Sequence, residues 1–409
     1  MTIKRSAPVG GVFTPDIETD VILPEIPSVP IREYSGFLRP NDSTPARALG
    51  EKFAAEMKEG FVADFERSAA YCERNGESGP DKMVHVPTFT IVDGMVYMTY
   101  YANTDTDGET PSYQGARLAM CPENDPEDLT VIDIQKAGDT LDGEVITGVY
   151  DTILLHKDDR ELYILWTAKT TQYYRFYCVY DIPTKTLGPI RVNRFRVGEI
   201  TNDFSMSGMH HALYASGISH RRMFADIGIM QGVTKRVENG VEYYYTGIYS
   251  GAFTAIAKSC DFITWEFVAT PDFPNNSVWE NATYVLNDKV YYFARQNECL
   301  QGFLTYYDLV TGEWAPPFLI ADEQSRAVFF RYKDTLYLMH APKDRLGVGI
   351  VRVDPEDLTK STPLLIADMK SSCFYPFAKL YGETLYVAYT VARQHIRLTK
   401  IQFEKYVAL

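Results

Sequence analysis

The stretch ENATYVLNDKVYYFARQ, residues 280–296, decides the fold that this sequence predicts. Two runs rich in Val, Tyr and Phe flank a polar turn at residues 287–289, and this pattern is typical of a β-hairpin. The hairpin starts with an acid, Glu280, and its second strand ends near a base, Arg295. Because a hairpin returns the chain to the end at which it started, we expect these two side chains to lie side by side.

The same hairpin recurs along the chain after residue 80. Each copy carries a marker tyrosine in its second strand: Tyr97, Tyr163, Tyr243, Tyr291, Tyr337 and Tyr386. The last three markers are 46 and 49 residues apart, which is the period of a four-stranded propeller blade. The sequence therefore predicts an all-β protein, a β-propeller of six blades, with five or seven blades as alternatives.

The first part of the chain differs from the rest. Residues 1–80 predict an extended segment and one helix over 44–74, while residues 81–409 form the predicted propeller catalytic domain. The last copy has only three evident strands, and an open ring would leave strand edges exposed. We therefore expect an N-terminal segment, within residues 10–35, to supply the missing strand.

One polar or aromatic side chain stands at the head of each copy: His85, Asp151, Asp226, Glu280, Arg326 and Tyr375. All but Asp226, whose copy has a longer turn, stand 11 or 12 residues before the marker tyrosine. Since the first strand of each blade lines the axis, this register predicts that the six side chains ring one end of the central channel. Acids, bases and cations that converge in this way favour an active site. A structural ring satisfied by water is the alternative.

Such a ring contains the groups that glycoside hydrolysis needs. The reaction uses two carboxyl groups, one of which protonates the leaving oxygen, and Asp151, Asp226 and Glu280 are candidates. Crowding of like charges would raise the pKa of one of them toward neutral pH. Arg295 and Arg326 are suited to bind the carboxylate of an acidic sugar.

Further side chains are candidates for substrate contact. The returning strands place Trp166 beside the second head, and Tyr100 or its neighbour Tyr101 beside the first, where each could stack on a sugar ring. His211 lies in an insertion near residues 205–217, and His340 follows a marker strand. His85 is a candidate acid, base or ligand of a sugar hydroxyl.

The 280–296 hairpin resembles the sialidase hairpin, in which a glutamate heads one strand and a carboxylate-binding arginine ends the next. This resemblance implies that Tyr375 is a nucleophile polarised by Glu280, with Arg295 and Arg326 as substrate clamps. It also implies that one of the two aspartates, Asp151 or Asp226, is the acid/base.

Other motifs agree only partly with that family. SCDFITW, residues 259–265, is similar to a shortened sialidase Asp-box, and that shorter form is also similar to five-bladed furanosidases and arabinanases. His85-Val-Pro stands where sialidases carry Arg-Ile-Pro, and the third sialidase arginine has no clear match.

Two other function classes stay open from the sequence. HVPTFTIVDGMVYMTYYAN, residues 85–103, is similar to the first catalytic strand of propeller polysaccharide lyases such as ulvan lyases. That resemblance implies β-elimination on a glycan that contains uronic acid, with His85 and Tyr375 as base and acid. The third class is a non-catalytic propeller that binds glycan or protein.

Charge and composition narrow the partners. The formal net charge of −14 repels nucleic acid, no stretch is apolar enough to span a bilayer, and we expect an oligosaccharide or polysaccharide as the partner. The six cysteines form no CxxC pair, and no motif predicts a metal or other cofactor. No signal-peptide-like apolar segment follows Met1, which predicts a cytoplasmic protein, or a secreted or periplasmic one if the chain is trimmed.

Overall fold

The computed structural model describes residues 34–39, 43–59, 61–66, 81–158, 160–220, 223, 226–251, 253–271, 278–296, 301–321, 325–342 and 345–407. Contacts between Cα atoms divide the chain into two units, Met1–Arg32 and Glu33–Leu409. All of the described residues belong to the second unit.

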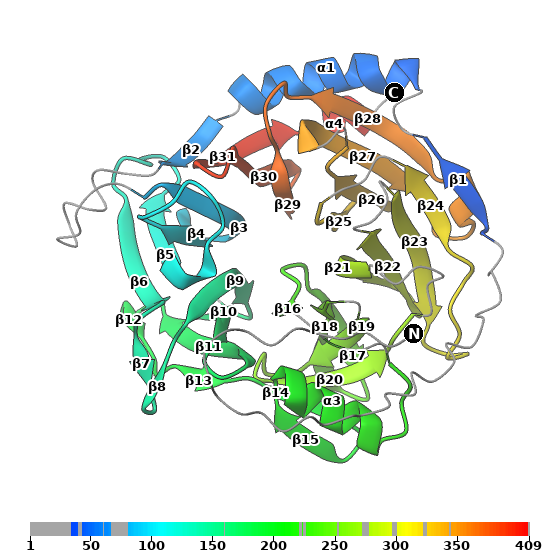
Figure 1. The fold of residues 1–409 in the computed structure, drawn as a ribbon. Coiled ribbons are helices and arrows are strands. Elements are labelled where there is room, and N and C mark those ends of the chain that lie inside the picture. The colour runs from blue at the N-terminus through cyan, green and yellow to red at the C-terminus, as the bar shows by residue number, and fades with distance from the viewer. Residues whose placement is uncertain are drawn as a thin grey trace, which may run out of the picture. The chain divides into compact units, whose positions relative to one another are not determined.

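Six sheets of four or more strands follow one another through the described residues and surround a common centre (Figure 1). The first consists of β3 (Met83–Val92), β4 (Met95–Asn103), β5 (Gln114–Pro122) and β6 (Thr130–Lys136). The second consists of β9 (Gly148–His156), β10 (Glu161–Lys169), β11 (Tyr173–Asp181), β12 (Thr186–Leu187) and β13 (Arg191–Val192). The third consists of β14 (Arg194–Val197), β15 (Ile200–Asp203), β16 (Ile227–Ile229), β17 (Thr234–Glu238), β18 (Val241–Ser250), β19 (Phe253–Ser259) and β20 (Thr264–Ala269).

The remaining three sheets involve segments from the N-terminal part of the chain: the fourth and the sixth each include a strand from it, and a helix from it packs against the fifth. The fourth consists of β21 (Val278–Leu286), β22 (Lys289–Gln296), β23 (Gln301–Asp308), β24 (Phe318–Ala321) and β1 (Gly36–Leu38). The fifth consists of β25 (Val328–Tyr332), β26 (Thr335–His340), β27 (Gly347–Val353) and β28 (Thr362–Asp368), and the sixth of β29 (Phe374–Tyr381), β30 (Thr384–Val391), β31 (His395–Gln402) and β2 (Phe61–Glu66). A small hairpin, β7 (Thr140–Leu141) and β8 (Glu144–Val145), and the helices α1 (Thr44–Glu59), α3 (Met206–Ala215) and α4 (Glu404–Val407) lie outside these sheets.

In the first and fifth blades the strands succeed one another outward from the axis in chain order, whereas the third, fourth and sixth blades take their outermost strands from earlier in the chain. In the first blade the order is β3-β4-β5-β6, with antiparallel neighbours throughout. The inner strand β3 contacts β9 of the second blade and β29 of the sixth, so the first and last blades meet. The β-propeller predicted from the repeat is confirmed.

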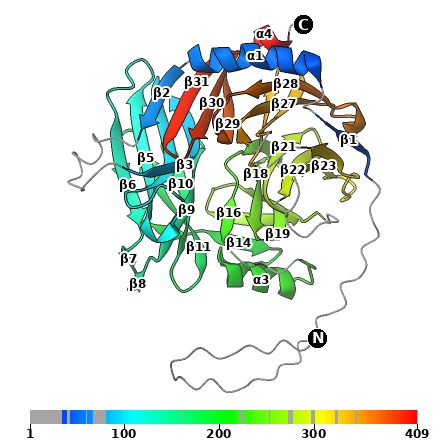
Figure 2. The same cartoon turned by 45° about the horizontal axis from the view of Figure 1, so that its top comes forward.

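The N-terminal helix is shorter than the sequence pattern predicts. It ends at Glu59, and the chain continues as β2, which pairs antiparallel with β31 (Figure 2). The prediction of one helix over 44–74 is therefore wrong for residues 61–66, because pairing with an exposed sheet edge outweighs a weak helical pattern; residues 67–74 lie outside the described residues. An N-terminal strand does complete the last sheet, but it is Phe61–Glu66 and not a segment within residues 10–35 as expected; residues 10–33 of that range lie outside the described residues.

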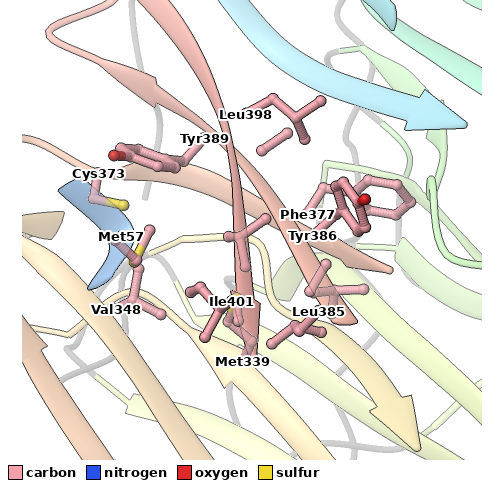
Figure 3. Packing of buried hydrophobic residues seen from close by; sticks show 14 of the residues in the cluster. Met57, Met339, Val348, Cys373, Phe377, Leu385, Tyr386, Tyr389, Leu398 and Ile401 are labelled. Carbon is pink, nitrogen blue, oxygen red and sulfur yellow. The ribbon is translucent and has the colours of Figure 1, made fainter. Parts of the chain in front are cut away.

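Apolar side chains fill the space between neighbouring blades. Figure 3 shows this packing where the fifth and sixth blades meet α1, with Met57, Met339, Val348, Cys373, Phe377, Leu385, Tyr386, Tyr389, Leu398 and Ile401 labelled. Each fully buried side chain of this size contributes about 1.5–3 kcal/mol, so the blades hold their inner strands in fixed positions. Among the described helices, none combines the length and apolar character needed to cross a bilayer.

Candidate active site

A cavity of about 400 Å³ lies where the inner strands begin. Its walls come from all six blades: Val86, Tyr101, Glu109, Pro111, Gln114, Tyr150, Asp151, Tyr173, Asp226, Tyr249, Glu280, Arg295, Arg326, Arg345, Tyr375 and Arg393. Five of the six predicted head residues are in this set. The remaining one, His85, lies directly behind the wall.

Irregular backbone at the strand starts directs side chains into this cavity. The ladder between the inner and second strands changes register at the cavity end in four blades. Val86, Asp151 and Tyr375 there have φ values of 58°, 53° and 51°, which is uncommon for residues other than glycine and an outlier for a β-branched one. A bulge re-aims a side chain, and such strain clusters at functional sites.

Glu280 is ionised and held by two arginines. Arg326 donates from Nε to Glu280 Oε1 at 2.8 Å, and Arg295 donates from Nη1 to Oε2. The predicted proximity of Glu280 and Arg295 is thus observed. Burial opposes ionisation, but the two guanidinium groups outweigh it and lower the pKa of Glu280 to about 2. The carboxylate is therefore negative throughout the neutral range.

Arg326 links Glu280 to a second buried carboxylate, Asp151. Its Nη2 forms an ion pair with Asp151 Oδ1, and Arg175 holds the other oxygen at 3.2 Å. Only 3% of the Arg326 side chain is exposed, and burial by itself would lower the pKa of its guanidinium. The two carboxylates instead raise it well above its ordinary value. Arg326 therefore positions the acids, and this buried placement does not fit the sequence prediction of a substrate clamp.

Tyr375 lies above this charged layer. Its ring covers the Arg326 guanidinium at 5.0 Å, and its hydroxyl is 3.4 Å from Arg295 Nη1, which also contacts Glu280. Burial, followed by the charge of Glu280, raises the pKa of the Tyr375 hydroxyl above 10. Tyr375 is therefore a neutral phenol at rest, next to an ionised carboxylate.

Asp226 is the cavity acid with the opposite electrostatic environment. Burial, followed by the charges of Asp151 and Glu280, raises the pKa of Asp226 to about 7. A carboxyl with this pKa is protonated in part of the molecules at neutral pH, so it can give or take a proton during a reaction. The cavity thus pairs one strongly ionised acid with one titrating acid.

Three charged cavity residues were missing from the predicted site. Glu109 lies on the loop between β4 and β5, where it accepts a hydrogen bond from Tyr101 and forms an ion pair with Arg393 at 2.9 Å. Arg345 precedes β27, and Arg393 lies between β30 and β31. The connections between second and third strands lie at the end where the inner strands begin, so the repeat itself indicates that residues on these connections reach the cavity.

Two aromatic side chains that were predicted to contact substrate do not line the cavity. Trp166 is fully buried, stacks against Phe176 and donates its indole hydrogen to Gln135 Oε1 at 2.7 Å. Tyr100 lies in the core, because alternation along β4 turns its neighbour Tyr101 to the cavity instead. The aromatic walls of the cavity are formed by tyrosines, with Tyr150 and Tyr173 at a ring distance of 5.8 Å.

His85 is a neighbour of the site and has no exposed surface. Its ring packs against Tyr375 at 4.6 Å, and its Nδ1 lies 3.2 Å from Thr390 Oγ1. Burial, followed by the charge of Arg393, lowers the pKa of its imidazole well below 6.5. His85 is therefore a neutral packing partner of Tyr375, and its burial does not fit the predicted contact with substrate.

The other two predicted histidines lie away from the cavity. His211 is on α3, a helix formed by the insertion in the third blade, and its Nδ1 is 3.1 Å from Asn202 Nδ2. His340 is buried on β26, paired with Gly349. Neither lines the cavity.

The site has no cluster of the kind that holds a metal. Within the part of the chain that the structure describes, no group of three or more His, Cys, Asp or Glu side chains is placed to bind a metal ion. What the cavity offers is acid–base chemistry on an anionic ligand. Arginines line the cavity, an ionised Glu280 stands beside the phenol of Tyr375, and Asp226 can exchange a proton.

Comparison with known proteins places this geometry in a fold group. No family model and no curated protein sequence matches the chain. Among solved structures, Trypanosoma rangeli sialidase in complex with 2,3-difluorosialic acid is 15% identical over 86% of this chain and 58% of its own length, with a TM-score of 0.55. The fold is a sialidase-like β-propeller.

Two further structures have similar values. Hadza microbial sialidase Hz136 is 11% identical over 79% of this sialidase-like propeller and 66% of its own chain, with a TM-score of 0.54. A Dyadobacter fermentans protein of unknown function is 13% identical over 83% and 98%, also with a TM-score of 0.54. The chain spans a little over half of the length of the Trypanosoma rangeli enzyme.

Proposed function

We propose that this protein is a glycoside hydrolase that removes a terminal acidic sugar of the sialic acid type. The observation that carries the proposal is the contact of one guanidinium, that of Arg295, with both Glu280 and Tyr375. A carboxylate and a tyrosine held together in this way form the pair that the sequence resemblance to sialidases implies. The fold agrees with that assignment.

Tyr375 acts as the nucleophile. As its oxygen attacks the anomeric carbon, its proton passes to Glu280, which is ionised at neutral pH. A phenol suits this substrate because it approaches a negatively charged sugar without the repulsion that a carboxylate nucleophile would meet. Sialidases are the known exception in which tyrosine takes this role.

Asp226 acts as the general acid and then as the base. With its pKa near 7 it protonates the leaving oxygen while the bond to Tyr375 forms. It then takes a proton from the water that attacks the anomeric carbon, and Tyr375 recovers its own proton from Glu280. Two displacements at one carbon retain the anomeric configuration.

The cavity arginines orient the substrate. Arg295, Arg345 and Arg393 line the same space, and guanidinium groups bind carboxylates with paired hydrogen bonds. A carboxylate on the sugar would place its anomeric carbon above Tyr375. Arg326 does not take part in this binding, because its nitrogens are already engaged with Glu280, Asp151, Tyr249 and Gln231.

The test is release of sugar from sialosides by the purified protein. We expect free sialic acid from the wild type, and a loss of about 10²–10⁴-fold for Tyr375→Phe and Glu280→Gln. Tyr214→Phe, on the exposed part of α3, is the matched control and should retain full activity. Absence of release by the wild type, or full activity of Tyr375→Phe, would overturn the proposal. Formation of an unsaturated product that absorbs in the near ultraviolet would indicate elimination instead.

A further inference from the structure

A second hollow, of about 460 Å³, lies beside the first cavity. Ala102, Asn103, Thr104, Asp105, Ser112, Tyr113, Gly115, Arg117, Asp133, Lys136 and Ala137 line it. Glu109, Pro111 and Gln114, which alternate with these residues along the chain, line the first cavity. One segment, residues 103–115, therefore separates the two spaces.

Both spaces open at the same end of the first blade. Neighbouring strands of this blade are paired as follows: Tyr101 with His85, Asn103 with Gln114 and Gly115 with Lys136. The start of β3, the end of β4, the start of β5 and the end of β6 therefore lie side by side at the cavity end of the blade. Neighbouring strands are about 4.8 Å apart. The hollow over β5 thus begins about 10 Å, or two strand spacings, outward from the inner strand.

The charged groups of the second hollow balance, and they are fewer than in the first cavity. Four arginines and four acids line the first cavity, whereas Arg117, Lys136, Asp105 and Asp133 are the charged residues of the second. In the second, Arg117 is buried and its charge is taken up by ion pairs with Asp81 and Asp133, while 31% of the Asp133 side chain remains exposed. Carboxylates that are exposed in this way accept hydrogen bonds from hydroxyl groups and repel anions. The second hollow therefore suits a neutral ligand rich in hydroxyls.

An aromatic side chain stands at the edge of the hollow. Tyr113 is 52% exposed, although large aromatic side chains are normally covered. The loop that carries it has a fixed shape, because Asn103 accepts hydrogen bonds from the backbone of Asp105 and Thr106 and donates one to Gly108. A rigid, half-exposed ring beside polar groups is suited to stack on the apolar face of a sugar.

We propose that this hollow is a binding site for the neutral sugars to which the terminal acidic sugar is attached, with Tyr113 as their stacking surface. The inference rests on the proposed hydrolase function and deepens it. The enzyme would then prefer an acidic sugar carried on an oligosaccharide over the same sugar on a small leaving group. The substrate would run from the arginine-lined cavity across the first blade.

The test compares methyl sialoside with sialyllactose, with free sialic acid measured for both. For Tyr113→Ala we expect KM for sialyllactose to rise about fivefold, with kcat for both substrates and KM for methyl sialoside unchanged. Tyr113→Phe keeps the ring and should behave as wild type. Tyr214→Ala, an equally simple removal of an exposed tyrosine on α3, is the matched control.

The outcomes separate the two proposals. If the wild type hydrolyses both substrates and Tyr113→Ala leaves KM for sialyllactose unchanged, the second hollow is not a sugar site and the hydrolase proposal stands. If Tyr113→Ala changes both substrates equally, its effect is on the first cavity and the inference also fails. If the wild type hydrolyses neither substrate, the proposed function and this inference fail together.

Discussion

The raised pKa of Asp226 leads to a prediction about the free energy of unfolding, which can be tested without knowing the substrate. In the unfolded chain this carboxyl ionises around its ordinary pKa of 3.8, whereas in the folded protein burial and the charges of Asp151 and Glu280 delay ionisation to about 7. The folded state therefore binds more protons between these values, so stability falls as pH rises through this window and is level above it. The interval corresponds to about 4 kcal/mol.

The perturbation is Asp226→Asn, which cannot titrate. Between pH 4 and 8 we expect the free energy of unfolding of wild type to fall relative to this variant by about 4 kcal/mol, as measured by urea denaturation at several pH values. Asp142→Asn, at an exposed turn where no such burial occurs, should follow the wild-type curve. Parallel curves for wild type and Asp226→Asn would refute the assignment of Asp226 as a titrating acid, and with it the proposed proton donor.

Three further predictions concern the parts of the site separately. Arg326→Met leaves two buried carboxylates with one arginine each and should lower the free energy of unfolding by about 3–5 kcal/mol. The control Arg160→Met breaks an ion pair of a 68% exposed arginine and should lower the free energy of unfolding by less than about 1 kcal/mol. Equal losses for the two variants in urea denaturation would contradict the bridging role of Arg326. Trp166→Phe should lower the free energy of unfolding by about 0.5–3 kcal/mol and leave KM unchanged, since the indole contacts Gln135 and not the cavity. A large rise in KM would indicate that Trp166 contacts the substrate after all. Above pH 7, kcat/KM should fall as Asp226 ionises, and this limb should be absent from the residual activity of Asp226→Asn.

The repeat in the sequence was enough to predict most of the fold. Alternating strands whose last marker tyrosines are 46 and 49 residues apart can bury both faces only when blades stack side by side, and this placed the head residues around one opening. What the pattern could not give was the identity of the strand that completes the sixth sheet. Phe61–Glu66 becomes a strand because β31 offers it an edge, and an edge exists only in the folded ring.

The sequence predicted correctly that the residues at the heads of five blades line the cavity. It could not decide which of two adjacent residues on a returning strand faces the cavity. The fixed register brought Glu280, Arg295 and Tyr375 together as expected. It did not bring Tyr100 and Trp166 to the cavity, because alternation along β4 turns Tyr101 there instead and Trp166 stacks against Phe176 in the core. The sequence also predicted that Arg326 binds substrate, because only the structure reveals that its guanidinium is already paired with the carboxylates of Asp151 and Glu280.

The most direct test of the account is to trap the sugar on the protein. The Trypanosoma rangeli enzyme is described with 2,3-difluorosialic acid as a covalent intermediate, and the same reagent can be incubated with this protein and followed by intact-protein and peptide mass spectrometry. The account predicts a single adduct on the peptide that contains Tyr375, lost in Tyr375→Phe. An adduct on Glu280, Asp151 or Asp226, or hydrolysis of sialosides without an adduct on Tyr375, would contradict it.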